Sequence, residues 1–273
     1  MKRTFYIFIL LGLGLMLTSC MEKEAPKIEG MVYIPAGEFV MGSDESDEEA
    51  LGKEFGLRKE RYYEDEMPKR KVQSTGYYID RYELTNSKYK KYMEATGAKA
   101  PPNWEKGQIP KDKEEHPVTY VTWFEAHDYC KWVGKRLPTE QEWERAARGD
   151  NGNKYSWGND YDETKANLNS GEVKRVGSYV DDKSPHGVYD MAGNVMEWVD
   201  DWYDAYPDNP SFNKDYGGDK HKVLRGGLGG MSGHYVINKI YARGANRNYY
   251  IPGGAGDDGG FRCAKSYKDG GGK

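Results

Sequence analysis

The stretch His186-Gly-Val-Tyr-Asp-Met-Ala-Gly-Asn-Val-Met-Glu-Trp-Val-Asp-Asp-Trp-Tyr203 combines residues that ordinary helices and strands do not combine. Gly187 and Gly193 allow backbone angles that side chains forbid. Asp190 and Glu197 supply carboxylates among large apolar residues, and a buried polar group left unpaired costs about 1–3 kcal/mol. The stretch therefore predicts a tight turn followed by a buried strand. Its oxygens either accept internal hydrogen bonds or bind a hard cation.

Several other stretches carry local structural signals. Residues 31–43 alternate and predict a hairpin that turns at Pro35-Ala-Gly37. Residues 77–85 predict a strand, and Thr85 can cap a helix that Gly97 ends. Residues 124–133 predict a second helix. Thr139 and Glu142 form a capping box that starts a further helical stretch with an apolar face.

The segment from Gly187 to Trp198 resembles the signature of the formylglycine-generating (sulfatase-modifying factor) family. Other family landmarks occur at Glu83-Leu-Thr-Asn86, Gly134-Lys-Arg-Leu-Pro-Thr-Glu-Gln-Glu-Trp143, Leu224-Arg-Gly-Gly227, Ala242-Arg-Gly-Ala-Asn-Arg247 and Gly260-Phe-Arg-Cys-Ala264. The resemblance covers about residues 31–267. It implies an α+β chain with a C-type-lectin-like fold, in which two helices accompany small antiparallel sheets and many irregular loops.

The N-terminus predicts export. Lys2 and Arg3 precede an apolar run, 5–17, of about 13 residues, whereas a bilayer crossing needs about 20. The run ends in Leu17-Thr-Ser-Cys20, which resembles a bacterial lipobox. This resemblance implies a signal peptide at 1–19 and a lipid on Cys20.

We therefore divide the chain into that signal peptide, a tether at 20–30, one domain at 31–267 and a tail at 268–273. The lipid would anchor the protein to the bacterial outer membrane or cell surface.

Composition excludes several classes of function. The net charge is −4, and no basic cluster with interleaved aromatic residues suggests nucleic acid binding. The five histidines lack metal-ligand spacing, and no phosphate-binding loop occurs. The 23 tyrosines and 7 tryptophans predict a core of aromatic side chains with polar tips.

The cysteines argue against catalysis. In an exported protein Cys130 and Cys263 suggest a disulfide, with two buried free thiols as the alternative; by resemblance they match a structural disulfide of the family. The family's enzyme uses two further cysteines just after its Arg-Gly-Gly sequence. Here the segment 228–235 holds none. Because a thiolate is the nucleophile and copper ligand that this chemistry needs, we expect no enzyme activity and no required cofactor.

The resemblance also implies a structural calcium ion. Its ligands would be the side chains of Asp190 and Glu197 and the main-chain carbonyls of Gly193 and Val195. The hydrogen-bonded turn described above remains the alternative.

The C-terminal third predicts a binding site. Arg225, Arg243, Arg247 and Arg262, with Phe261, are framework residues, because a guanidinium can tie loop carbonyls and carboxylates together. The segments between them are rich in Gly, Tyr, Asn and Asp, as in binding loops. This framework closely resembles the variable region of diversity-generating retroelement proteins, especially Treponema variable-protein lipoproteins.

The variable region would span about 225–262. We expect the following residues to share one exposed ligand-binding surface: Gly229, Gly230, His234, Tyr235, Tyr241, Asn248, Tyr249, Tyr250, Gly254, Gly256, Asp257 and Asp258.

The sequence thus predicts a surface lipoprotein that binds a macromolecule, for example a protein on a host or neighbouring cell. The alternatives are a structural lipoprotein of the envelope or motility machinery and an oxidase of the formylglycine-generating kind.

Overall fold

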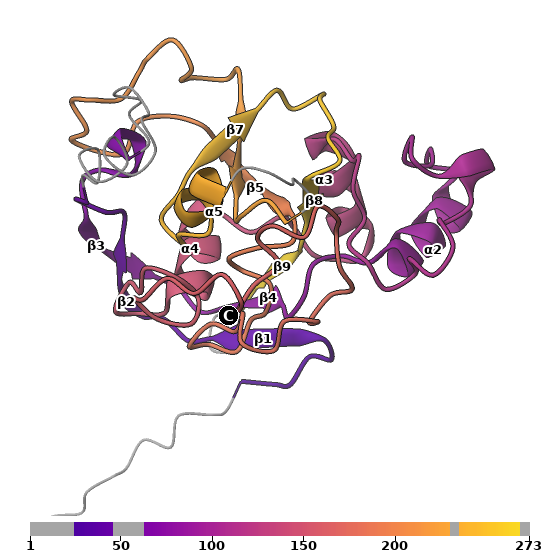
Figure 1. The fold of residues 1–273 in the computed structure, drawn as a ribbon, viewed down its shortest axis with the longest axis horizontal. Helices are drawn as coiled ribbons and strands as arrows, with labels where there is room; N and C mark the ends of the chain where they lie inside the picture. Colours follow the sequence, from indigo (N-terminus) through magenta and orange to yellow (C-terminus); the bar gives the residue numbers. More distant parts are fainter. Residues whose placement is uncertain (1–24, 46–62, 230–234, 268–273) are drawn as a thin grey trace, which may run out of the picture.

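The computed structural model describes residues 25–45, 63–229 and 235–267, and Figure 1 shows the fold. The predicted signal peptide, Cys20 and the tail lie outside the described residues. Among the described residues, no helix is both long enough and apolar enough to cross a membrane. The elements are β1 (Met31–Ile34), β2 (Gly37–Met41), η1 (Glu64–Glu66), β3 (Arg70–Ser74), β4 (Tyr77–Asp80), α2 (Asn86–Thr96), η2 (Glu105–Gly107), α3 (Trp123–Trp132), α4 (Glu140–Arg148), β5 (Met196–Trp202), β6 (Lys222–Arg225), α5 (Tyr235–Tyr241), β7 (Asn248–Tyr250), β8 (Gly259–Phe261) and β9 (Ala264–Ser266).

Three small sheets hold these elements together. The first has the order β1-β4-β9, the second pairs β2 with β3, and the third has the order β7-β6-β5-β8. Within the described chain every one of these pairings is antiparallel except that of β5 with β8. The prediction of small antiparallel sheets is therefore confirmed except at this one edge.

The signature stretch forms the predicted turn and buried strand. Asp190 and Asn194 adopt positive φ angles of 58° and 72°, and Gly187 has a φ of 85°. The chain then enters β5, which lies between β6 and β8 in the largest sheet. The first four residues of β5 are buried.

The hairpin predicted for residues 31–43 is wrong. β1 pairs with β4 and β2 pairs with β3, so the chain passes from one sheet to another at Pro35-Ala-Gly37. Buried Arg145 stands at this crossing: its Nη1 donates to the Pro35 carbonyl at 2.8 Å. A side chain at Gly37 would lie 2.9 Å from Nη2 of the same arginine. A long-range contact thus replaces the local pairing.

The helices begin where the capping signals predict. Thr139 accepts a hydrogen bond from the Glu142 amide, and the Glu142 side chain accepts one from the Thr139 amide, at the start of α4. Thr122 and Glu125 form the same box at α3. Thr85 precedes α2, but its hydroxyl makes no capping bond. Four α-helices are present among the described residues where the fold prediction named two, and α5 lies in the predicted variable region, for which no helix was predicted.

Large aromatic side chains fill the core and satisfy their polar tips internally. Trp198 donates from Nε1 to the Val121 carbonyl at 3.0 Å, and the Tyr77 hydroxyl donates to the Glu142 carbonyl at 2.7 Å. Both rings are buried. This is the arrangement that buried Trp and Tyr require, and it agrees with the composition.

Buried ion pairs join the C-terminal third to the rest of the fold. Glu144 of α4 accepts from Arg225 at 2.6 Å, and Glu140, one turn earlier, accepts from Arg247 at 2.7 Å. The other pairs are Arg243 with Glu66 and Arg262 with Glu197. All four arginines, their partners and Phe261 are buried. The prediction that these arginines and Phe261 are framework residues is confirmed.

Removing one member of a buried pair should destabilise the fold strongly. We expect Arg225→Met to lower the free energy of unfolding by about 3–5 kcal/mol. Among the described residues, Glu144 would keep Arg148 as its only buried cation, and the buried carbonyls of residues 244–246 would lose their donor. Urea denaturation measures the change. The control is Lys71→Met, since Lys71 and Glu38 pair at the surface with 72% and 53% of their side chains exposed. If the two variants lowered the urea midpoint equally, the buried Arg225–Glu144 pair would stabilise the fold no more than the exposed pair.

Cys130 and Cys263 form the predicted disulfide. Their sulfurs are 1.98 Å apart and their Cα atoms 5.6 Å apart. Both residues are fully buried, and the bridge ties α3 to the segment between β8 and β9.

We expect the oxidised domain without Cys20 to show no free thiol after denaturation. In the double variant Cys130→Ala/Cys263→Ala the free energy of unfolding should fall by about 4–5 kcal/mol, because the bridge closes a long loop in the unfolded chain. The sequence separation is 133 residues. Thiol titration followed by thermal unfolding tests both points, and two titratable thiols in the oxidised domain would overturn the pairing.

Candidate functional site

An open groove of 1290 Å³ lies between the segment that follows β5 and the chain leading into β7. In Figure 1 these are the orange loop and the yellow strand at the upper edge, away from β1. Tyr241, Asn248 and Tyr249, three predicted ligand-binding residues, line the groove. The other lining residues are Glu64, Asp65, Tyr203, Pro210, Ser211, Phe212, Asn213, Tyr216, Asn246 and Arg247.

Aromatic rings form much of the wall. Tyr249, the central residue of β7, stacks on Tyr203 with ring centroids 4.3 Å apart and 28° between the planes. The ring of Tyr216 is 5.0 Å from that of Tyr249, and the ring of Phe212 is 5.1 Å from that of Tyr203. Tyr203 and Phe212 are buried, whereas Tyr216 is 43% exposed. The wall therefore has a fixed base and an open outer ring.

Arg247 supports this wall from below. Its Nε and Nη2 donate to the Glu140 carboxylate at 2.7 and 3.1 Å, and its guanidinium lies 4.8 Å from the centroid of the Tyr203 ring. Burial opposes the ionisation of Glu140, but Arg247 and Arg225 hold its pKa below the usual value. The ion pair therefore positions the stacked tyrosines and links them to α4.

Asp65 is the most strongly perturbed acid of the groove. Burial raises its pKa to about 6, against the opposing charge of Arg247. The Tyr203 hydroxyl donates to its Oδ2 at 2.7 Å. Asp65 is therefore mostly ionised at neutral pH and becomes protonated below about pH 6.

Tyr250 does not share this groove, which corrects the prediction of one common surface. Successive side chains of a strand point to opposite faces, so Tyr249 and Tyr250 diverge. Tyr250 pairs in register with Lys222, whose Nζ lies 4.1 and 4.0 Å from the ring centroids of Trp123 and Trp202. Tyr250 is 47% exposed on that side.

The predicted residues Gly254, Gly256, Asp257 and Asp258 lie in the loop between β7 and β8. This loop is fixed by backbone hydrogen bonds: the Tyr120 amide donates to the Gly256 carbonyl and the Met196 amide to the Asp258 carbonyl, both at 2.8 Å. Asp257 is exposed, and burial raises the pKa of Asp258. None of these four residues lines the groove.

Gly229 is buried, so its prediction as a surface contact is wrong. A side chain there would begin 2.5 Å from the Asn167 carbonyl oxygen and 2.7 Å from the Cα of Asn194. Gly229 is therefore a framework residue. Gly230 and His234 lie outside the described residues; Tyr235 begins α5, but its side chain is not described.

Two glycine substitutions separate the framework from the loops. In Gly229→Ala the added methyl group should be too close to Asn167, and the free energy of unfolding should fall by about 1–3 kcal/mol. Gly253→Ala is the matched control, because nothing lies within 4 Å of the position its Cβ would take. Thermal unfolding of the two variants gives the comparison. If Gly229→Ala were as stable as the control, Gly229 would not be held in this contact.

The predicted calcium ligands gather around Arg262. Both Glu197 oxygens accept from its Nε and Nη2 at 2.6 Å, and Oε2 also accepts from Trp143 Nε1 at 2.9 Å. Oδ2 of Asp190 accepts from the Gly177 amide at 2.6 Å. These carboxylates therefore have the internal partners that the hydrogen-bonded alternative requires.

The remaining two predicted ligands have structural roles. Gly193 allows a close approach, since a Cβ there would lie 2.6 Å from the Asn167 carbonyl oxygen. The Val195 amide donates to buried Glu83 at 3.3 Å. Among the described residues, no group of three or more His, Cys, Asp or Glu side chains could hold a metal ion. Both oxygens of Glu197 are thus already used by Arg262, and the calcium site stays a prediction.

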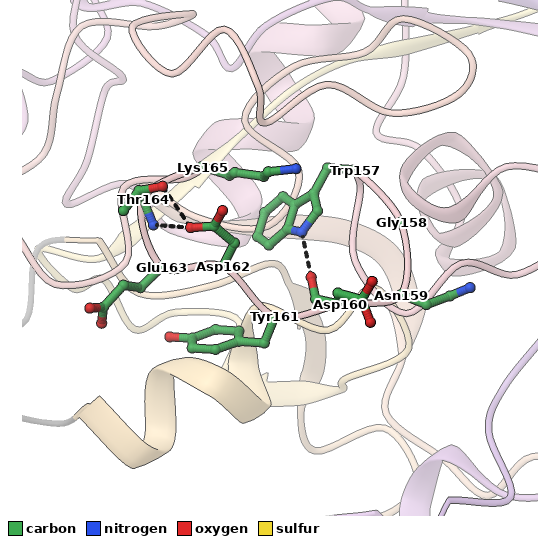
Figure 2. A pocket seen from close by; sticks show the side chains of 9 residues that line it. All are labelled: Trp157, Gly158, Asn159, Asp160, Tyr161, Asp162, Glu163, Thr164 and Lys165. Atoms are coloured by element: carbon green, nitrogen blue, oxygen red, sulfur yellow. Dashed lines mark hydrogen bonds between the residues drawn. The ribbon is translucent and has the colours of Figure 1, made fainter.

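A second hollow, of 570 Å³, is formed by residues 157–165. Figure 2 shows that this loop bonds to itself: Trp157 donates to the Asp160 carbonyl at 2.8 Å, and the Thr164 amide to Asp162 at 2.9 Å. Tyr161 lies near α5, with the Nζ of Lys239 5.9 Å from its ring centroid. No predicted ligand-binding residue lines this hollow, so the groove beside β7 is the better candidate.

The opposite wall of the groove was not predicted from the sequence. That wall comes from the segment after β5 and from η1, outside the predicted variable region. A signal was present, because residues 203–217 repeat the Tyr, Asn, Asp and Gly composition of the predicted loops. Only the fold shows that the two segments meet.

Comparison with known proteins places the chain in a family. The sulfatase-modifying factor enzyme 1-like domain family matches residues 18–267. The formylglycine-generating enzyme of Mus musculus is 30% identical over 304 residues, which cover 87% of this chain and 75% of that protein. The chain therefore belongs to the sulfatase-modifying factor family, which includes enzymes, and the sequence resemblance is confirmed.

Two further relatives define how far this likeness extends. Serine/threonine-protein kinase Pkn1 of Chlamydia trachomatis serovar L2 is 34% identical over 270 residues, covering 90% of this chain but 40% of the kinase. This chain thus spans less than half the length of that relative. Treponema denticola variable protein 1 has a TM-score of 0.65 at 23% identity, over 87% of this chain and 95% of its own. The predicted C-type-lectin-like fold is confirmed.

Proposed function

We propose that this chain is a non-catalytic, ligand-binding member of the family and that the groove beside β7 is its recognition site. The observation that carries the proposal is the wall of stacked tyrosines, held from below by the buried Arg247–Glu140 pair. Tyrosine supplies a large contact area at low entropy cost, and rigid support reduces the cost of binding. The groove, at 1290 Å³ and open to solvent, suits part of a macromolecule.

The cysteine inventory supports a non-enzymatic role. The activity implied by the family resemblance uses two cysteines after the Arg-Gly-Gly sequence. The chain has only Cys20, Cys130 and Cys263, and the last two are joined as a disulfide. No thiol therefore lies in the segment where that chemistry would occur.

We further propose that the groove is displayed at a cell surface through a lipid on Cys20. In Figure 1 the chain leading into β1 leaves the molecule at the edge opposite β7. An anchor there would direct the groove away from the membrane, toward a protein of a host or a neighbouring cell. Radiolabelled palmitate incorporation that is lost in Cys20→Ala would support this anchor.

The proposal includes diversification of the C-terminal stretch. The Tyr, Asn, Asp and Gly composition of this stretch and the fold shared with a variable protein support it. A near-copy of the DNA that encodes residues 224–264, differing mainly at adenines and lying beside a reverse transcriptase gene, would be its signature. A locus without such a copy would leave the groove as a fixed binding site.

Substitution of the exposed tyrosines tests the site. We expect Tyr216→Ala/Tyr249→Ala to lose binding across arrays of peptides and glycans to which the oxidised domain binds, because truncation of interface anchors costs about 2 kcal/mol or more. Tyr250→Ala is the matched control, since it removes the neighbouring tyrosine from the opposite face of the sheet.

Thermal unfolding of all variants distinguishes lost binding from lost folding, and Tyr216→Ala alone should leave the melting temperature unchanged because its ring is open to solvent. An array profile that Tyr216→Ala does not alter would place the site elsewhere.

A direct assay tests the absence of oxidase activity. The protein, incubated with copper, oxygen and a sulfatase-type cysteine peptide, should leave the peptide mass unchanged, because the chain has no thiolate in the segment concerned. Mass spectrometry detects the loss of thiol that accompanies formylglycine formation. Protein-dependent formation of that product would refute the non-catalytic proposal.

A further inference from the structure

The charges along the groove indicate which chemical group it accepts, if the proposed binding function holds. Glu64 and Asp65 of η1 form one side, and both are partly exposed. Among the described lining residues, Arg247 is the single basic side chain. Its guanidinium donates to Glu140 and to the Asp65 and Asp204 carbonyls. The charge of Arg247 is therefore offset by Glu140. Asp65 accepts a hydrogen bond from the Tyr203 hydroxyl at 2.7 Å, but this donor is neutral and does not offset its negative charge.

The opposite side adds to this negative charge. The segment from Tyr203 to His221 carries four aspartates and two lysines. The side-chain amide of Asn209 donates to the Glu64 carbonyl at 2.6 Å, which holds this segment against η1. Charges of one sign along a cleft concentrate the opposite charge within it. An anionic ligand would meet the carboxylates of η1 on one side and a segment of net negative charge on the other, although none of the aspartates of that segment lines the groove.

The rings of the groove can also bind cations. A cation within about 6 Å of a ring centroid is attracted by the negative face of the ring. This protein already uses that contact nearby: the Arg247 guanidinium lies 4.8 Å from the centroid of Tyr203 and 4.0 Å from that of Tyr206. Tyr216 and Tyr249 continue the stack outward, where the groove is open.

We propose that the groove binds a cationic side chain, an arginine or lysine presented by a protein ligand. The rings of Tyr216 and Tyr249 contact its charged end, and the carboxylates of Glu64 and Asp65 lie within the same groove to neutralise it. This assignment rests on the proposed binding function and adds the charge and class of the ligand. An acidic peptide or an uncharged glycan is the competing occupant.

The test uses three probes with the oxidised domain at neutral pH: acetyl-Arg-Lys-Arg-Lys-amide, acetyl-Glu-Asp-Glu-Asp-amide and a neutral oligosaccharide of similar size. Tyrosine fluorescence and NMR titration report binding. We expect the basic peptide alone to bind, and added salt to weaken it because exposed charges are screened. Tyr216→Leu removes the ring but keeps an apolar side chain. It should weaken binding about tenfold, the loss produced by about 1.4 kcal/mol of ring–cation contact.

Glu64→Gln keeps the shape of the side chain and removes its charge, so it should weaken binding of the basic peptide as well. Glu94→Gln, on exposed α2, is the matched control and should change nothing. Groove-dependent binding of the acidic or neutral probe would overturn the cationic assignment while leaving the binding function intact. Binding of the basic peptide that neither Tyr216→Leu nor Glu64→Gln weakens would also overturn the assignment, as would no binding of that peptide. Loss of array binding in the tyrosine variants remains the separate test of the binding function itself.

Discussion

Two glutamates one helical turn apart on α4 set the constraint on which the fold depends. Glu140 and Glu144 are buried, and a buried carboxylate without a cation is costly. From the C-terminal third, Arg247 supplies the cation for Glu140, and Arg225 joins Arg148 of the same helix at Glu144. Because Arg225 and Arg247 contact these glutamates, the end of β6 and the start of β7 lie beside α4. The Arg247 guanidinium then packs against the Tyr203 ring in the groove. The candidate site therefore depends on a charge requirement created 107 residues before Arg247.

Local signals in the sequence predicted local structure well. The turn and strand of 186–203 and the capping box at Thr139 are encoded within a few residues, and the structure confirms them. The hairpin prediction for residues 31–43 was wrong because a distant residue, buried Arg145, donates a hydrogen bond to the Pro35 carbonyl where the chain passes between two sheets. Helix α5 was not predicted, because the Gly-rich segment that precedes it has no helical pattern. Glu66 shows the same limit: its sequence surroundings are those of a solvated acidic loop, yet it pairs with Arg243, 177 residues away.

The candidate site was predicted in part, for a geometric reason. Composition identified Tyr241, Asn248 and Tyr249, which line the groove. It could not show that Tyr249 and Tyr250 point to opposite faces, because that requires knowing that β7 is a strand and which strand it pairs with. Nor could it bring Tyr216 to Tyr249, since their approach depends on the whole sheet. Gly229 resembles its loop neighbours in sequence but is enclosed by Asn167 and Asn194.

The distant pairing of α4 with the C-terminal arginines also governs when the chain can fold. Synthesis delivers the N-terminal part first, and this part already contains Glu140 of α4 and Glu197 of β5. Their cations, Arg247 and Arg262, follow later. A nascent chain that ends before Arg225 lacks both arginines that pair with Glu140, which are Arg225 and Arg247. Strand β4 likewise lacks its neighbour β9 until residue 266 is made. Contacts of such long range also slow folding. The domain therefore cannot complete its three sheets and its buried ion pairs until almost all of it has been synthesised.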